Sequence, residues 1–178
     1  RNMDKETLLR RTFALATEAR ARGDGPFGAL LADDEGNILL EHSNGVLSVP
    51  DTTNHAETGL VRLASLKLKP EVVARATLFT STEPCAMCAA ATYWAGIPKV
   101  VFGCPETQLA MWAKQPGFQA HEHPYSGGAP PVDSRTILVG KNGLGIQREV
   151  IGPLLHTESL APHKGYWGPA SDSDALAA

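Results

Sequence analysis

Three residues that can bind a transition metal stand in two short motifs of the sequence. The motif NHAET places His55 two residues before Glu57, and the motif EPCAMC contains Cys85 and Cys88. Two thiolates and one imidazole suit zinc, whereas magnesium and calcium prefer oxygen ligands. The i, i+3 spacing of the cysteines puts both sulfurs on one side of a helical turn. The sequence therefore predicts a zinc site on His55, Cys85 and Cys88.

The identity of the fourth ligand decides whether such a zinc is structural or catalytic. Structural sites close with four protein ligands, while catalytic sites keep one position for water. Cys104 follows an apolar segment and fits a buried, inert thiol, but the sequence does not exclude His121 or His123 as a ligand. Glu57 has a different use, because a carboxylate beside a three-ligand zinc can move protons from the bound water.

This interpretation makes a geometric demand on the helix that follows His55. Positions i and i+2 of a regular helix face about 200° apart. His55 and Glu57 can therefore serve one site only if the end of their helix points at the metal. The alternatives are a structural zinc, or a C-x-x-C redox pair with an unrelated histidine and glutamate, and neither explains Glu57.

The segments that must position these residues alternate between helical and strand patterns. The expected helices cover residues 4–22, 55–68, 85–96, 106–113 and a short piece of 154–167. The expected strands cover residues 27–32, 38–42, 76–82, 99–103 and 146–150, with a long loop up to about residue 135. This order predicts an α/β fold in which helices cover a mixed sheet.

Composition and length agree with one globular domain, which we place at residues 1–168, followed by a disordered tail at 169–178. The chain has 178 residues, of which 43% are hydrophobic and 20% charged, and a formal net charge of −3. This negative net charge argues against binding to nucleic acid that is dominated by electrostatic attraction. No apolar run is long enough to cross a bilayer. An odd number of cysteines, three, with two of them in C-x-x-C, favours metal binding or redox chemistry over a disulfide framework. We therefore expect the protein in the reducing cytoplasm.

The ordered set H-x-E and then P-C-x-x-C is the signature of zinc-dependent nucleobase deaminases. Residues 25–103, from GPFGALL to PKVVFG, resemble the cytidine deaminase-like superfamily, and especially its bacterial guanine deaminase and tRNA adenosine deaminase branches. The resemblance implies a three-layer α/β/α sandwich with a mixed five-stranded sheet. It also implies zinc on His55, Cys85 and Cys88, with Glu57 as the proton shuttle. The implied reaction is hydrolytic deamination of a heterocyclic base with release of ammonia.

The same resemblance suggests four substrate contacts. Asn44 stands where related deaminases have an asparagine that contacts the base, although a turn residue beside Gly45 is the alternative. Phe27 and Trp94 match aromatic residues of guanine deaminases, and both could equally be core residues. The backbone N–H of Ala56, at a helix start, could stabilise negative charge on an oxygen.

Other segments depart from the guanine deaminase pattern. The acidic GFDD-like element is replaced by PGFQAHEHPYSGG, which leaves a guanine-type purine and a smaller ring, cytosine or an amino-triazine, both open. The segment CPETQLAMW is not basic, which disfavours tRNA adenosine editing. We also expect a homodimer, since the C-terminal segment of guanine deaminases often closes the site of a partner subunit. A zinc-stabilised binding module without turnover is the rival class of protein.

Overall fold

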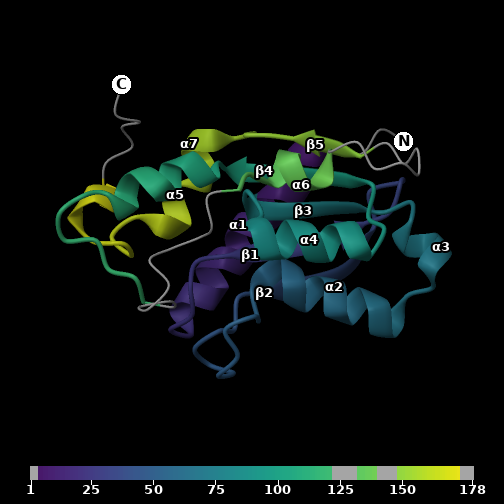
Figure 1. Cartoon of the computed structure of the whole chain (residues 1–178), viewed down its shortest axis with the longest axis horizontal. Coiled ribbons are helices and arrows are strands. Elements are labelled where there is room, and N and C mark those ends of the chain that lie inside the picture. Colours follow the sequence, from purple (N-terminus) through teal and green to yellow (C-terminus); the bar gives the residue numbers. More distant parts are fainter. Residues whose placement is uncertain (1–3, 122–131, 140–147, 173–178) are drawn as a thin grey trace.

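The computed structural model describes residues 4–121, 132–139 and 148–172, which fold around one five-stranded sheet (Figure 1). The helices are α1 (Lys5–Ala21), α2 (Ala56–Lys67), α3 (Pro70–Val73), α4 (Ala86–Trp94), α5 (Glu106–Ala113), α6 (Ser134–Leu138) and α7 (His156–Ser159). The strands are β1 (Gly28–Ala32), β2 (Ile38–Ser43), β3 (Thr77–Thr82), β4 (Lys99–Cys104) and β5 (Glu149–Ile151). Two 3-10 helices, η1 (Ala161–His163) and η2 (Pro169–Asp172), follow.

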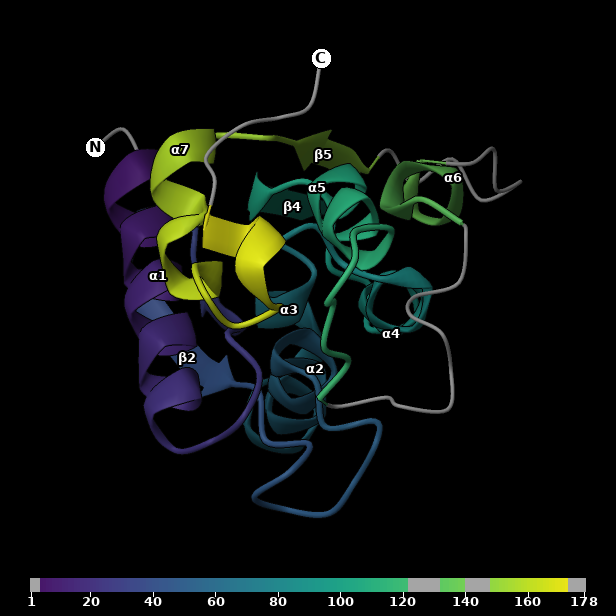
Figure 2. The same cartoon turned by 90° about the vertical axis from the view of Figure 1, so that its left-hand side faces the viewer.

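The sheet is mixed, with strand order β2-β1-β3-β4-β5. Strand β1 pairs antiparallel with β2 and β3, whereas β3, β4 and β5 run parallel. Helix α1 and the C-terminal α7 cover one face, and α2, α4 and α6 cover the other (Figure 2). The expected three-layer α/β/α sandwich with a mixed five-stranded sheet is confirmed.

The apolar pattern of the first helix explains how α1 joins the sheet. Its expected inward positions are all buried, namely Leu8, Leu9, Thr12, Phe13, Leu15, Ala16 and Ala19. Asp4 caps the helix by accepting a hydrogen bond from the backbone N–H of Thr7 at 3.2 Å. Gly28 allows β1 to lie against this helix, because a Cβ there would stand 2.5 Å from the carbonyl oxygen of Thr12.

The parallel strands place the chemistry-bearing motifs at one edge of the sheet. Thr82 at the end of β3 lies opposite Cys104 at the end of β4. The backbone N–H of Glu83 bonds to the carbonyl of Cys104 at 2.7 Å, so the chain leaves both strands side by side. In open α/β sheets, ligands bind outside the carboxyl ends of parallel strands.

Several elements differ from the sequence expectation. Helix α3 was not expected, and α6 begins inside the region expected to be loop. The tail expected to be disordered from residue 169 begins with η2, where buried Ser171 accepts a hydrogen bond from the backbone N–H of Trp167 at 3.2 Å. That expectation is wrong for residues 169–172, because the turn folds back on a buried tryptophan, and residues 173–178 lie outside the described part. The expected strand at 146–150 is present as β5, of which 146 and 147 are not described.

None of the helices in the described ranges is both long and apolar enough to span a membrane.

Candidate metal centre

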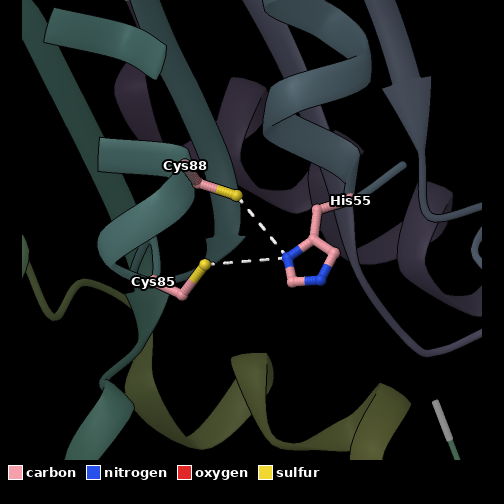
Figure 3. A group of neighbouring side chains, drawn as sticks. All are labelled: His55, Cys85 and Cys88. Atoms are coloured by element: carbon pink, nitrogen blue, oxygen red, sulfur yellow. Dashed lines mark hydrogen bonds between the residues drawn. The ribbon is translucent and has the colours of Figure 1, made fainter. Parts of the chain in front are cut away.

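His55, Cys85 and Cys88 converge on one point between two helices (Figure 3). Nδ1 of His55 lies 3.7 Å from Sγ of Cys85 and 3.6 Å from Sγ of Cys88. A tetrahedral zinc with bonds of about 2.3 Å to sulfur and about 2.05 Å to nitrogen would separate these ligand atoms by about 3.6 Å. The three donors therefore have the chemistry and the spacing of a zinc site.

Both helices that meet here begin with a metal-binding side chain in place of an ordinary cap. His55 and Cys85 occupy the N-cap positions of α2 and α4, in extended backbone, and neither side chain makes a capping hydrogen bond. Ser, Thr, Asp and Asn are the usual residues there, because their oxygens satisfy free backbone N–H groups. Both helices thus begin without a side-chain cap. The partial positive charge at each helix N-terminus lies beside the three ligands.

The extended conformation of His55 also meets the geometric demand that the sequence raised. Because His55 precedes the helix and Glu57 lies in its first turn, both can face the same point. Oε2 of Glu57 lies 3.4 Å from Sγ of Cys88, although Glu57 is not one of the three clustered ligands. Its carboxyl therefore lies beside the metal position and is available for proton transfer.

Electrostatic coupling leaves one proton on the two cysteines. A hydrogen bond from the Cys88 thiol lowers the pKa of Cys85 to about 4. The pKa of Cys88 is raised, because this thiol keeps the proton that it donates to Cys85 and because it is buried. Metal ligation requires both thiolates, so zinc binding releases this remaining proton.

Glu57 is fixed by a hydrogen bond that the sequence analysis did not anticipate. The Thr80 hydroxyl donates to Oε1 of Glu57 at 2.9 Å from strand β3. Burial raises the pKa of Glu57, and the nearby Cys85 thiolate adds to this shift. A usable signal was present in the sequence: TSTEPC puts polar residues into an otherwise apolar strand just before the cysteines. Polar side chains in a strand that is buried on both faces need a partner.

Asn44 and Ala56, two of the predicted substrate contacts, are both buried. Asn44 follows β2 and is fully buried, and its Oδ1 accepts a hydrogen bond from the backbone N–H of Val46 at 3.0 Å. This bond confirms the turn role that was its alternative, and its contact with a base stays a prediction. Ala56 is buried as the first residue of α2, directly after His55.

Phe27 belongs to an aromatic cluster contributed largely by the C-terminal segment. Its ring lies 5.4 Å from that of His163 and 5.9 Å from that of Trp167. These contacts support a packing role for Phe27, whose contact with a base stays a prediction.

Trp94 is not brought to the metal centre of its own chain. It is the last residue of α4, at the opposite end from Cys85, and it is 85% exposed. The core alternative for Trp94 is therefore wrong, because the described residues leave its side chain largely exposed.

No described residue adds a fourth protein ligand to the cluster. His121 bonds through Nε2 to the carbonyl of Tyr166 at 2.9 Å. Cys104 is fully buried away from the group, and burial raises the pKa of its thiol, as expected of an inert cysteine. His123 lies outside the described residues.

The C-terminal segment contributes a buried histidine that the sequence analysis also missed. Nδ1 of His163 accepts from the indole N–H of Trp167 at 3.0 Å, which leaves Nε2 to donate to the Thr82 hydroxyl at 3.2 Å. Thr82 stands three positions before Cys85. The chain from Trp167 through His163 thus braces the end of β3, from which the cysteine motif departs.

The mixed sheet, the His-Cys-Cys ligand set and the adjacent glutamate together define a zinc-dependent deaminase. Residues 2–104 match the family model described as the cytidine and deoxycytidylate deaminase zinc-binding region. The matched region covers more than half of the chain and contains all three ligands and Glu57. The chain therefore belongs to this family of hydrolytic zinc deaminases.

Individual relatives agree with this assignment. The chain is 35% identical over 161 residues to a probable cytosine deaminase of Schizosaccharomyces pombe, covering 89% of this chain and 90% of the relative. It is 43% identical over 105 residues to a guanine deaminase of Bacillus subtilis, covering 58% of this chain and 66% of the relative. A solved guanine deaminase from Nitrosomonas europaea has a TM-score of 0.72 at 21% identity, with 92% of this chain and 85% of the other covered.

Proposed function

We propose that this protein hydrolytically deaminates a free nucleobase or a related amino-heterocycle, with cytosine as the first candidate and guanine as the second. The observation that carries the proposal is the position of Glu57, whose Oε2 lies 3.4 Å from Sγ of the ligand Cys88 without joining the ligand set. A merely structural zinc has no use for a buried carboxylate in this place.

The choice of a free base rests on the extent of similarity. The 161 residues shared with the probable cytosine deaminase exceed the family model's residues 2–104, so the likeness includes part of the C-terminal half. The guanine deaminase match covers only 58% of the chain, which supports guanine less. An amino-triazine has the same reacting amidine as cytosine and belongs to the same proposal.

In this proposal the protein's own groups bind the base and move the protons. When zinc is bound, it supplies a Lewis acid that lowers the pKa of a water molecule at its open position. Glu57 takes a proton from the attacking water and delivers it to the ring nitrogen beside the reacting carbon. It then carries a proton to the exocyclic amine, which leaves as ammonia. Asn44 orients the base, and the hydroxyl of Thr80 holds the Glu57 carboxylate in position.

We place the reaction in the cytoplasm and expect a homodimer. Cysteines that act as metal ligands and form no disulfide are typical of a reducing compartment, which supports the cytoplasmic location. Several large apolar side chains are exposed on the single chain, and burying them against a second copy would explain their exposure: Trp94, Leu66 and Val139.

A tRNA adenosine deaminase is the second candidate. A tRNA-specific adenosine deaminase of Haemophilus influenzae is 36% identical over 101 residues, although this match covers only 57% of the chain. The net charge of −3 makes RNA a poor electrostatic partner.

Ammonia release from cytosine, 5-azacytosine, ammeline, guanine, adenosine and an adenosine-containing RNA hairpin tests the proposal. Turnover of a free base is the expected result, and Glu57→Gln should abolish it while about one zinc per chain remains bound. Turnover of the RNA alone would select the second candidate. A zinc-loaded protein without activity on any of these substrates would favour the non-catalytic binding module.

A further inference from the structure

Asp24 is a fully buried carboxylate in the turn between α1 and β1. Its Oδ1 accepts hydrogen bonds from the backbone N–H groups of Leu47 at 3.0 Å and Ser48 at 2.8 Å, and its Oδ2 accepts one from the Ser48 hydroxyl at 2.7 Å. Burial alone would raise the pKa of Asp24, but these bonds and the charge of Arg22 outweigh it, so the pKa is lowered. An ionised Asp24 thus ties this turn to a segment 23 and 24 positions further along the chain.

Leu47 and Ser48 belong to a loop of residues 45–54 that connects β2 to α2 and projects from the body of the protein (Figure 2). Residues 47–53 are all exposed, so the loop buries little apolar surface that could hold it in place. A loop with few buried apolar contacts opens easily unless hydrogen bonds attach it to the rest of the fold. The bonds to Asp24 supply such an attachment.

The two ends of this loop join the predicted base contact to the metal centre. Asn44 directly precedes the loop, and the ligand His55 directly follows it. The backbone N–H of Gly45 donates to the carbonyl of Asn54 at 3.1 Å, which closes the loop where it begins and ends. Asn44 and His55 therefore flank a hydrogen-bonded pair, and their relative placement depends on the closed loop.

Arg22 holds the other side of Asn44. Its Nη2 donates to the carbonyl oxygen of Asn44 at 2.9 Å, and its Nε lies 3.5 Å from Oδ2 of Asp24. The backbone N–H of Asn44 donates to the carbonyl of Phe27 at 3.0 Å. Both peptide groups of Asn44 are thus held by the segment that contains Asp24.

We propose that Asp24 is a positioning residue for base binding, which together with Arg22 holds the 45–54 loop closed and so fixes Asn44 relative to the metal ligand His55. This inference rests on the proposed function, in which Asn44 orients the base. Opening the loop would strip a buried carboxylate of three hydrogen bonds, and that cost favours the closed conformation. A binding residue that is already in place avoids the cost of ordering it when the base binds.

A double-mutant cycle tests whether Asp24 acts through Asn44. In zinc-loaded Glu57→Gln protein, Asp24→Ala and Asn44→Ala should each weaken cytosine binding about tenfold, near the upper value for one lost hydrogen bond. The two changes together should also weaken it about tenfold, because the contact is already lost, whereas independent effects would give about 100-fold. Calorimetry measures this binding, with guanine as the probe if the wild-type protein deaminates only guanine.

Two further variants separate positioning from folding. Asp24→Asn keeps Oδ1 as an acceptor for both backbone N–H groups, so it should bind the base within about threefold of the protein with Asp24. Arg22→Gln changes an exposed side chain and removes its bond to the Asn44 carbonyl. It should weaken binding about threefold, and only while Asn44 is present.

Asp33→Ala is the matched control. Asp33 organises the turn between β1 and β2 in a similar way, because its Oδ1 accepts from the backbone N–H groups of Glu35 at 2.9 Å and Asn37 at 2.8 Å. It stands at the opposite end of β2 from Asn44. Asp33→Ala should leave base binding unchanged, and zinc content should be the same in Asp24→Ala and in this control.

Several results would overturn the inference. Additive effects of Asp24→Ala and Asn44→Ala, or an equal loss in Asp33→Ala, would show that Asp24 supports only the fold in general. Undiminished binding in Asn44→Ala would remove the contact through which Asp24 acts. Zinc loss in Asp24→Ala would show that the loop serves the metal site and not the base.

The cycle of Arg22→Gln with Asn44→Ala decides in the same way if Asp24→Ala does not fold. A wild-type protein that deaminates no free base removes the proposed function and this inference with it. An active wild-type protein with additive variants removes the inference alone.

Discussion

Thr80 donates its hydroxyl hydrogen to Oε1 of Glu57 across 2.9 Å, and this bond ties the candidate proton shuttle to the central strand β3. The other oxygen of Glu57 lies 3.4 Å from Sγ of Cys88. The carboxyl is therefore held between the sheet on one side and a metal ligand on the other. A group that transfers protons benefits from such fixation, because small displacements of a catalytic group lower the rate strongly.

Thr80→Val should lower kcat about 5- to 50-fold and leave KM nearly unchanged, because it removes one hydrogen bond to a charged group while conserving volume. Steady-state ammonia release with parallel zinc analysis measures this. Thr77→Val is the matched control, since Thr77 is a buried threonine at the opposite end of the same strand. An unaltered kcat in Thr80→Val would mean that Glu57 is positioned by other contacts.

The three-ligand site makes a second prediction about metal and stability. Cys88→Ser should reduce zinc from about one per chain to a small fraction and lower the free energy of unfolding by about 3 kcal/mol or more, because the metal joins the starts of α2 and α4. Chelation of the wild-type protein should produce the same loss. Metal analysis and denaturant unfolding measure both effects.

Cys104→Ala is the control for the zinc prediction. Its thiol is fully buried but lies outside the cluster, so it should keep its zinc and lose only packing energy. Zinc loss in Cys104→Ala equal to that in Cys88→Ser would contradict the ligand assignment.

The sequence predicted the ligands and most elements because both depend on local spacing. The seven inward positions of α1 repeat with helical periodicity, and the cysteine pair at i, i+3 needs only one helical turn to converge. The sequence alone could not verify that His55 and Glu57 face the same metal position. The extended backbone of His55, at the N-cap of α2, satisfies this demand.

The remaining parts of the site depend on contacts between distant segments. Thr80 of β3 reaches Glu57 of α2 only through the packing of the helix on the sheet, which brings together residues that are 23 positions apart in the sequence. Trp94 is a different case. The expected helix over residues 85–96 already placed it at the opposite end from Cys85, and the structure shows it there at the end of α4.

A third prediction concerns pH and His163, which is fully buried in a neutral state. Burial lowers the pKa of His163 from 6.5 to about 3. Below pH 6.5 the unfolded chain therefore takes up a proton that the folded chain refuses until about pH 3. The contribution of His163 to the free energy of unfolding is complete above pH 6.5 and falls as the pH drops, by about 1.4 kcal/mol per pH unit.

His163→Gln removes this titration while keeping an acceptor for Trp167 and a donor for Thr82. Between pH 6.5 and 5.5 the wild-type protein should lose about 1 kcal/mol more stability than this variant, measured by denaturant unfolding with zinc content followed in parallel. His121→Gln, at an exposed histidine, should keep the wild-type slope. Parallel stability curves for the wild-type and His163→Gln proteins would show that His163 takes up its proton in the folded state, and that the Trp167–His163–Thr82 chain does not hold it neutral.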